Sequence, residues 1–88
     1  MSKKEKPEWA VNENIKIEYD AREDLDNGIQ PLNKVLKETK EFKPGEKYLL
    51  TTAFVPLPMI ELLEGNGFKC YSEVISDNEV RNYFLKNN

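Results

Sequence analysis

The amino-acid sequence predicts a two-layer α/β sandwich, in which a four-stranded mixed sheet carries two helices on one face in the order β-α-β-α-β-β. Strand-like alternation of apolar and polar residues occurs near both ends of the chain. Two helical segments, each opening at a proline, separate the first three strands. Because β-α-β crossovers are right-handed, both helices are expected on the same side of the sheet, which leaves the other face without helices.

Length and composition limit the class of protein. The 88 residues suffice for a single domain, which we place at 15–86, after a charged tail at 1–14. No apolar run approaches the roughly 18 residues needed to cross a bilayer, and the opening MSKKEKPEW lacks the apolar centre of a secretory signal. A single cysteine permits no internal disulfide. These features predict a cytoplasmic protein that does not act at a membrane.

Charge and residue usage argue against several functions. The net charge is −3, whereas nucleic-acid binding depends on neutralising phosphates with lysine and arginine, so we expect no nucleic-acid partner. The chain has no histidine, and it therefore lacks the usual general base at neutral pH and the imidazole ligand of many metal sites. We expect no metal, no cofactor and no catalytic residue, which argues against an enzyme.

The first strand is predicted at 15–20, in the segment IKIEYD. Its residues alternate, so that Ile15, Ile17 and Tyr19 are expected on one buried face. The polar segment AREDLDNG follows, and its final Asn-Gly is a strong turn signal. We interpret this segment as a loop that leads to the first helix.

The first helix is predicted to begin at Pro31, because proline suits the first helical position. One helical face then carries a regular set of buried side chains, namely Leu32, Val35, Leu36, Thr39 and Phe42. The turn residues KPGE at 43–46 end the helix.

The second half of the chain repeats this alternation of strand and helix. KYLLTTAF at 47–54 is rich in strand-forming residues. Pro56 and Pro58 exclude a central strand but suit a first helical turn, and GNG at 65–67 ends that helix. FKCYSEVI and VRNYFL, separated by SDNE, predict an antiparallel hairpin. The first three strands are expected to run parallel.

The spacing DARxxLxxGxxPLxxVLxxxxxFxPGExxxL, followed by FxPxPMxxLLxxxGF, resembles the TusA/SirA-like sulfur-carrier superfamily over about residues 20–84. It is most similar to a branch of unknown function whose domains often carry an upstream tryptophan, as at Trp9 here. The resemblance implies a sheet of strand order 1-2-4-3. It also implies an association with redox modules such as hemerythrin-like and cupin domains, and so a protein partner that handles redox chemistry or sulfur.

The resemblance also bears on chemistry. Sulfur carriers of this superfamily hold a Cys-Pro pair at the start of the first helix, where the helix dipole favours the thiolate that carries a persulfide. The matching residues here are Gln30 and Pro31. Glutamine cannot ionise or form a persulfide, so we expect a non-catalytic binding or interaction domain. A sulfur-transfer or redox-related carrier is the alternative.

A binding site is predicted beyond the carboxyl ends of the parallel strands, where ligands of open sheets gather. Its candidate residues are Asp20, Arg22, Gln30, Pro31, Phe54 and Pro56. Gln30 and the free N–H groups of the first helical turn would bind an anion or a carboxylate of a partner, or Gln30 simply faces solvent as a cap. Asp20 and Arg22 equally fit an ion pair that pins the loop.

Two other features carry alternatives. Cys70 fits a small apolar residue of the core, or else it is a reactive thiol. The helix-free face of the sheet is either an exposed partner surface or is covered by the tail that contains Trp9. The residues expected on that face are Tyr71, Tyr83, Leu49 and Leu85.

Overall fold

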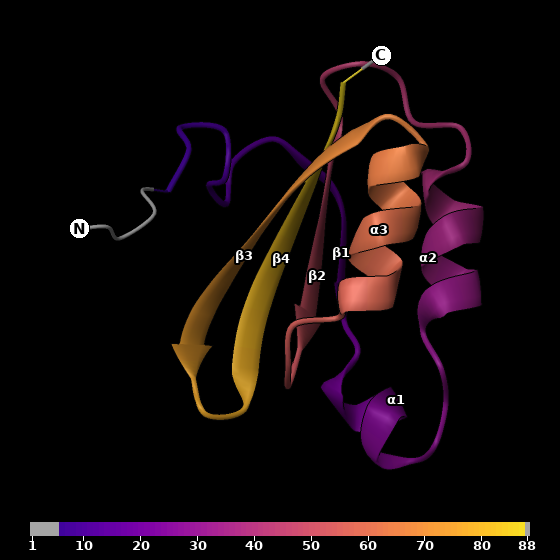
Figure 1. Ribbon diagram of the computed structural model, residues 1–88, viewed down its shortest axis with the longest axis vertical. Helices are drawn as coiled ribbons and strands as arrows, with labels where there is room; N and C mark the ends of the chain where they lie inside the picture. The colour runs from indigo at the N-terminus through magenta and orange to yellow at the C-terminus, as the bar shows by residue number, and fades with distance from the viewer. Residues whose placement is uncertain (1–5, 88) are drawn as a thin grey trace.

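The computed structural model describes residues 6–87 of the chain. Its elements are β1 (Ile15–Asp20), α1 (Arg22–Asp26), α2 (Leu32–Thr39), β2 (Lys47–Thr52), α3 (Leu57–Gly65), β3 (Phe68–Ser76) and β4 (Glu79–Lys86). Figure 1 shows the strands as one sheet, with α2 and α3 against one of its faces. The predicted four-stranded mixed sheet is confirmed, in a small α+β domain with three helices.

The strands are arranged in the order β1-β2-β4-β3. β1 pairs in parallel with β2, whereas β4 is antiparallel to both β2 and β3. β1, β2 and β3 therefore run in one direction, and their carboxyl ends lie at the same end of the domain. The same end of the domain holds α1 and the beginnings of α2 and α3, at the bottom of Figure 1.

The short helix α1 replaces the loop that the sequence predicts after the first strand. Asp20 Oδ1 accepts a hydrogen bond from the backbone N–H of Arg22 at 3.1 Å, and Leu25 N donates to the Ala21 carbonyl at 2.9 Å. Leu25, the one apolar residue within α1, packs against the main core. The loop prediction was wrong because five residues are too few to show helical periodicity. The predicted turn does follow α1, where Gly28 adopts the left-handed conformation at φ 80°.

Helix α2 is shorter than its hydrophobic pattern suggests. Pro31 is its N-cap residue, and the Pro31 carbonyl accepts a hydrogen bond from Val35 N at 3.0 Å. The helix ends at Thr39, so Phe42 lies in the following turn instead of on the helix. Phe42 is nevertheless buried, because the turn returns its ring to the same core.

The main core lies between the sheet and its two longer helices. Its buried residues come from nearly every element and are Ala21, Val35, Phe42, Tyr48, Leu50, Met59, Leu63, Phe68 and Phe84. All six residues of β2 are buried, because this central strand is covered on both faces. The Tyr48 hydroxyl donates to Glu38 at 2.6 Å, so the polar end of this ring is also paired.

The sheet face without helices is covered by the N-terminal segment. Ala10 forms a second buried cluster with Leu49 and Tyr83, and the half-buried Trp9 packs against it. Lys47 Nζ donates to the Trp9 carbonyl at 2.9 Å, which fixes the backbone of the segment on the sheet. Of the two alternatives for this face, the structure therefore shows the one in which the segment with Trp9 covers it. Residues 1–5 of the expected tail lie outside the described residues.

A β-bulge lets β1 contribute to both clusters. The pairing of β1 with β2 shifts between Ile15 and Ile17. Ile15 therefore packs with Trp9 on the helix-free face, whereas Ile17 and Tyr19 pack against the main core. The prediction that all three share one face was wrong for Ile15, because one extra residue reverses the direction of a strand side chain.

Candidate binding pocket

An apolar pocket of about 160 Å³ opens where β2 ends and where α2 and α3 begin. An apolar cavity of about this size admits one benzene-sized group. The pocket is lined by Leu25, Gln30, Pro31, Leu32, Thr52, Phe54, Pro56, Pro58 and Met59. No lining residue is charged, so the arrangement suits one apolar group rather than an ion.

The structure brings four of the six predicted site residues to this pocket, namely Gln30, Pro31, Phe54 and Pro56. Asp20 and Arg22 do not reach it. They line a separate polar hollow with Glu23, Asp26 and Asn78. The predicted site is therefore divided between two neighbouring surfaces.

The bend after β2 positions one wall of the pocket. The buried Thr52 ends the strand, and its hydroxyl donates to the Phe54 carbonyl at 2.5 Å. Pro56 is buried at the N-cap of α3, and Pro58 occupies the first helical turn, where its missing N–H breaks no hydrogen bond. The Phe54 side chain is 53% exposed, which places its ring at the rim of the pocket.

The Asn82 side chain of the neighbouring strand β4 holds Thr52 in position. It is fully buried on β4, and its Nδ2 donates to the Leu50 carbonyl at 2.9 Å and to Thr52 Oγ1 at 3.0 Å. The Ser72 hydroxyl donates to Asn82 Oδ1 at 2.6 Å. These bonds connect three strands, and they satisfy a polar side chain that would otherwise be costly to bury.

Exposed apolar side chains surround the pocket. Ile29 is 52% exposed and Leu57 is 61% exposed, and each is next in sequence to a lining residue, while the exposed Phe54 lines the pocket itself. Isolated exposed apolar residues are common on protein surfaces, but several gathered beside one pocket are typical of an interaction site. We therefore take the pocket and these three residues as the candidate binding site.

Gln30 lies in solvent at the rim of the pocket. The N-cap residue of α2 is Pro31, and this helix end has no side-chain cap hydrogen bond. Gln30 is thus not a cap for α2. Gln30 is the polar lining residue that directly precedes α2 and its N-cap, and the residues around it in the pocket are mostly apolar.

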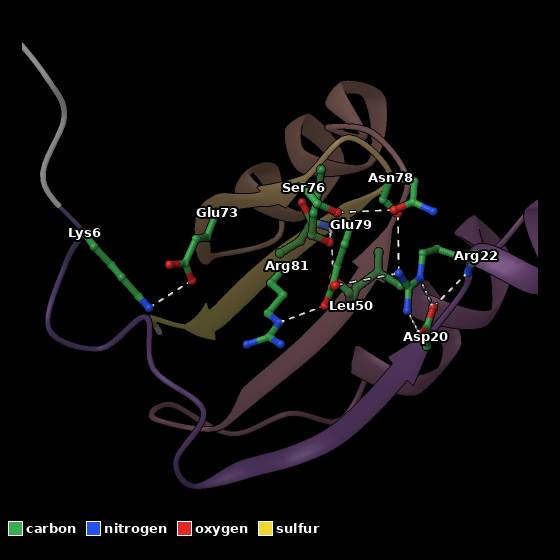
Figure 2. Close-up of polar contacts among 11 residues, drawn as sticks. Lys6, Asp20, Arg22, Leu50, Glu73, Ser76, Asn78, Glu79 and Arg81 are labelled. Carbon is green, nitrogen blue, oxygen red and sulfur yellow. Dashed lines mark hydrogen bonds and ion pairs between the residues drawn. The ribbon is translucent and has the colours of Figure 1, made fainter.

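Asp20 and Arg22 form the ion pair that the sequence left open as an alternative. Arg22 Nη2 lies 2.7 Å from Asp20 Oδ2, and Arg22 Nε lies 3.0 Å from Asp20 Oδ1. Arg22 Nη1 also lies 3.9 Å from Glu79, which pairs with Arg81 at 3.3 Å, as Figure 2 shows. The hydrogen bonds from Arg22 lower the pKa of Asp20. This network joins the end of β1 to β4.

Cys70 is poorly suited to carry sulfur. It is partly buried on β3 and packs against the main core, with its Sγ 3.9 Å from the Ile60 carbonyl. Burial, together with the nearby Glu64 carboxylate, raises the pKa of Cys70 to about 12. The thiol therefore stays protonated at neutral pH, whereas the thiolate is the nucleophile.

We expect iodoacetamide to alkylate Cys70 slowly in the folded protein at neutral pH. The smaller thiolate fraction should lower the rate by on the order of a hundred-fold or more, relative to an exposed cysteine. Intact-mass measurements over time report the rate, with the exposed Asn87→Cys change in a Cys70→Ser background as the control. Similar rates for the two proteins, or the same rate for Cys70 with and without denaturant, would show that Cys70 is reactive.

Part of the lining was missed by sequence reasoning. Leu25 is a lone leucine in the polar run REDLDNG, and that isolation was a usable signal for a side chain turned inward. Pro58 and Met59 were correctly placed on a helix, but no site prediction included them. Their position beside Gln30 depends on how the two helices pack, which hydrophobic periodicity does not specify.

Within residues 6–87, no group of three or more cysteine, aspartate or glutamate side chains is arranged to hold a metal ion. No helix in that same part of the chain is both long and apolar enough to cross a membrane. Comparison with protein-family models, curated proteins and solved structures finds no match for the chain.

Proposed function

We propose that this domain is a non-catalytic binding module, which holds an apolar side chain of a protein partner in the pocket where α2 and α3 begin. The observation that carries this proposal is the uncharged, apolar lining of a pocket of about 160 Å³. An anion would lose its hydration there without gaining a cationic side chain, so an apolar group is the better occupant. The exposed rim of Ile29, Phe54 and Leu57 supplies further contact area.

The resemblance to the TusA/SirA-like sulfur carriers supports the same site. The residue that matches their persulfide cysteine is Gln30, which lies at the rim of this pocket. We propose a TusA-like domain that retains partner contact at this end of the sheet and lacks the sulfur chemistry. A cytoplasmic redox or sulfur-handling protein is the partner class that this resemblance favours. The raised pKa of Cys70 argues against the alternative of a sulfur carrier.

An NMR titration with neutral N-acetyl-leucinamide and N-acetyl-phenylalaninamide tests the pocket directly. We expect the backbone amide resonances of Leu25, Leu32, Thr52 and Met59 to shift, because these residues line the pocket. Burying a single apolar side chain contributes about 1.5–3 kcal/mol, so the dissociation constants should be millimolar or weaker.

Two controls make this titration specific. N-acetyl-serinamide should cause no comparable shifts, and the Phe54→Ala substitution should weaken binding. Val74→Ala, at an exposed apolar position on the β3–β4 hairpin, should leave binding unchanged. Equal responses to all three amides, or shifts spread evenly over the domain, would refute a specific apolar site.

A further inference from the structure

We propose that the segment bound by this pocket is both apolar and basic: an apolar anchor residue of another protein, with lysine or arginine beside it. This inference rests on the proposed function and adds the charge of the partner. It is carried by the carboxylates that flank the pocket, by the shortage of free cations near them, and by the apolar surface that continues along α3.

Carboxylates lie near the pocket, in the neighbouring polar hollow and on α3. On α1, Glu23 and Asp26 are exposed and line the neighbouring polar hollow, whereas Leu25, which lies between them in sequence, lines the pocket. On α3, Glu61 is exposed and lies one helical turn after Leu57, on the same face of the helix. The ion pairs found among residues 6–87 use other carboxylates, so these three acidic side chains form no ion pair in that part of the chain.

The cations closest in sequence to the pocket are already engaged. The stretch 53–68, which holds the bend and α3, contains no lysine or arginine. Arg22 of α1 lines the same hollow as Glu23 and Asp26, but its ion pairs are with Asp20 and Glu79. Lys34 of α2 pairs with Glu38 at 2.8 Å. The hollow beside the pocket holds the carboxylates of Asp20, Glu23 and Asp26 against the single cation of Arg22, so it presents net negative charge that a basic partner would neutralise.

The apolar surface continues beyond the pocket along α3. Pro58 lines the pocket, and Leu62 lies on the same face of α3 one turn later, where it is 45% exposed. Glu61 is next to Leu62 on this outer surface. A peptide segment therefore fits better than a single side chain, with its anchor in the pocket, a second apolar residue against Leu62 and a cation beside Glu61.

A second copy of the chain is a poorer occupant of this surface. Two-fold pairing through α3 would bring Glu61 and Glu64 close to the same carboxylates of the other copy. Like charges that face each other across an interface oppose association. A basic segment of a different protein would instead gain from the same carboxylates.

Three acetylated and amidated peptides test the inference: GKKFLKKG, its charge-reversed form GEEFLEEG, and GKKSSKKG without an anchor. Each is titrated into the full chain by NMR at low salt. We expect GKKFLKKG to bind about ten-fold more tightly than GEEFLEEG, with shifts at the pocket, α1 and α3. The difference should shrink at high salt, because exposed charges are screened.

A charge-reversal variant gives the second measurement. Glu61→Lys should weaken GKKFLKKG several-fold and strengthen GEEFLEEG, while the binding of N-acetyl-leucinamide stays unchanged. Glu41→Lys is the matched control, because Glu41 is exposed beyond the far end of α2. It should alter none of these affinities by more than its small effect on net charge.

The outcomes separate this inference from the proposed function. Equal binding of GKKFLKKG and GEEFLEEG, with N-acetyl-leucinamide still bound at the pocket, would overturn the basic partner and retain the apolar site. Equal binding of GKKSSKKG and GKKFLKKG would overturn the anchored segment. If no peptide and no amide shifts the pocket resonances, both proposals fail. Self-association in sedimentation velocity that Leu62→Ser abolishes would assign the surface to a second copy instead.

Discussion

Replacing Phe84 with alanine is expected to lower the free energy of unfolding by about 3–5 kcal/mol. Phe84 is fully buried on β4, between Tyr48 of β2 and Cys70 of β3 in the register of the sheet. Both neighbouring strands hold β4 in place, so the backbone cannot collapse into the space that the ring leaves. Small domains are stable by about 5–15 kcal/mol, and this variant would therefore retain only a small margin.

The same substitution at Phe54 is the matched control. Its side chain is 53% exposed at the rim of the pocket, so Phe54→Ala should change the unfolding free energy by less than about 1 kcal/mol. Urea denaturation followed by circular dichroism measures both variants. Similar losses for the two proteins would contradict the division between a buried core phenylalanine and an exposed one at the pocket.

Changing Asn82 to aspartate is expected to destabilise the fold by about 3 kcal/mol or more at neutral pH. The amide Nδ2 now donates to the Leu50 carbonyl and to Thr52 Oγ1. An ionised carboxylate at this buried position cannot donate, and it would lie close to these oxygen atoms without a cation. The damage should extend to the pocket, because Thr52 is one of its lining residues.

The pH dependence of this variant follows from the sign of its pKa shift. Burial raises the pKa of a carboxyl group, so the folded-state pKa of the new aspartate would exceed its unfolded value of about 4. Below that unfolded value both states are protonated and the electrostatic penalty is absent. The penalty begins as the pH rises above the unfolded pKa, and it is complete above the folded pKa. Relative to wild type, the variant should therefore recover stability in acid.

Asn33→Asp is the control for this experiment, because it makes the same chemical change at an exposed position in the first turn of α2. A negative charge there is compatible with the helix dipole, so stability should change by no more than about 0.5–1 kcal/mol. Urea denaturation from acid to neutral pH compares both variants with wild type. If Asn82→Asp loses no more stability than Asn33→Asp at any pH, the Asn82 hydrogen bonds contribute little.

The sequence predicted those elements that show either a regular hydrophobic period or a strand-forming composition. Val35 and Thr39 are buried one turn apart on α2, so their spacing indicated the helix. All six residues of β2 are buried, so that strand showed no alternation and was indicated by its strand-forming residues. Helix α1 was missed because it is held by local hydrogen bonds and one inward leucine, too little for a periodic signal. Whether such a short segment forms a helix depends on its tertiary contacts, which a local sequence pattern does not show.

The sequence predicted at which end of the domain the candidate site lies. It did not predict on which face of the sheet each site residue lies. Topology places the ends of parallel strands together, and Gln30 and Phe54 do meet at the pocket. Asp20 and Arg22 lie at the same end, yet Asp20 follows the core residue Tyr19, and strand alternation directs it toward the opposite face. The pocket itself arises from the packing of two helix beginnings, which no local pattern encodes.

The bulge in β1 also bears on how this sequence can change by insertion and deletion. Pairing with β2 runs from Ile15 directly to Ile17, so Lys16 is the surplus residue. A chain that lost Lys16 would keep every remaining β1 side chain on its present face. Loss of Glu18 would instead turn Ile17 and Tyr19 to opposite faces. β1 can therefore lose a residue at position 16 without reversing its side chains, whereas loss of a residue at position 18 would reverse them.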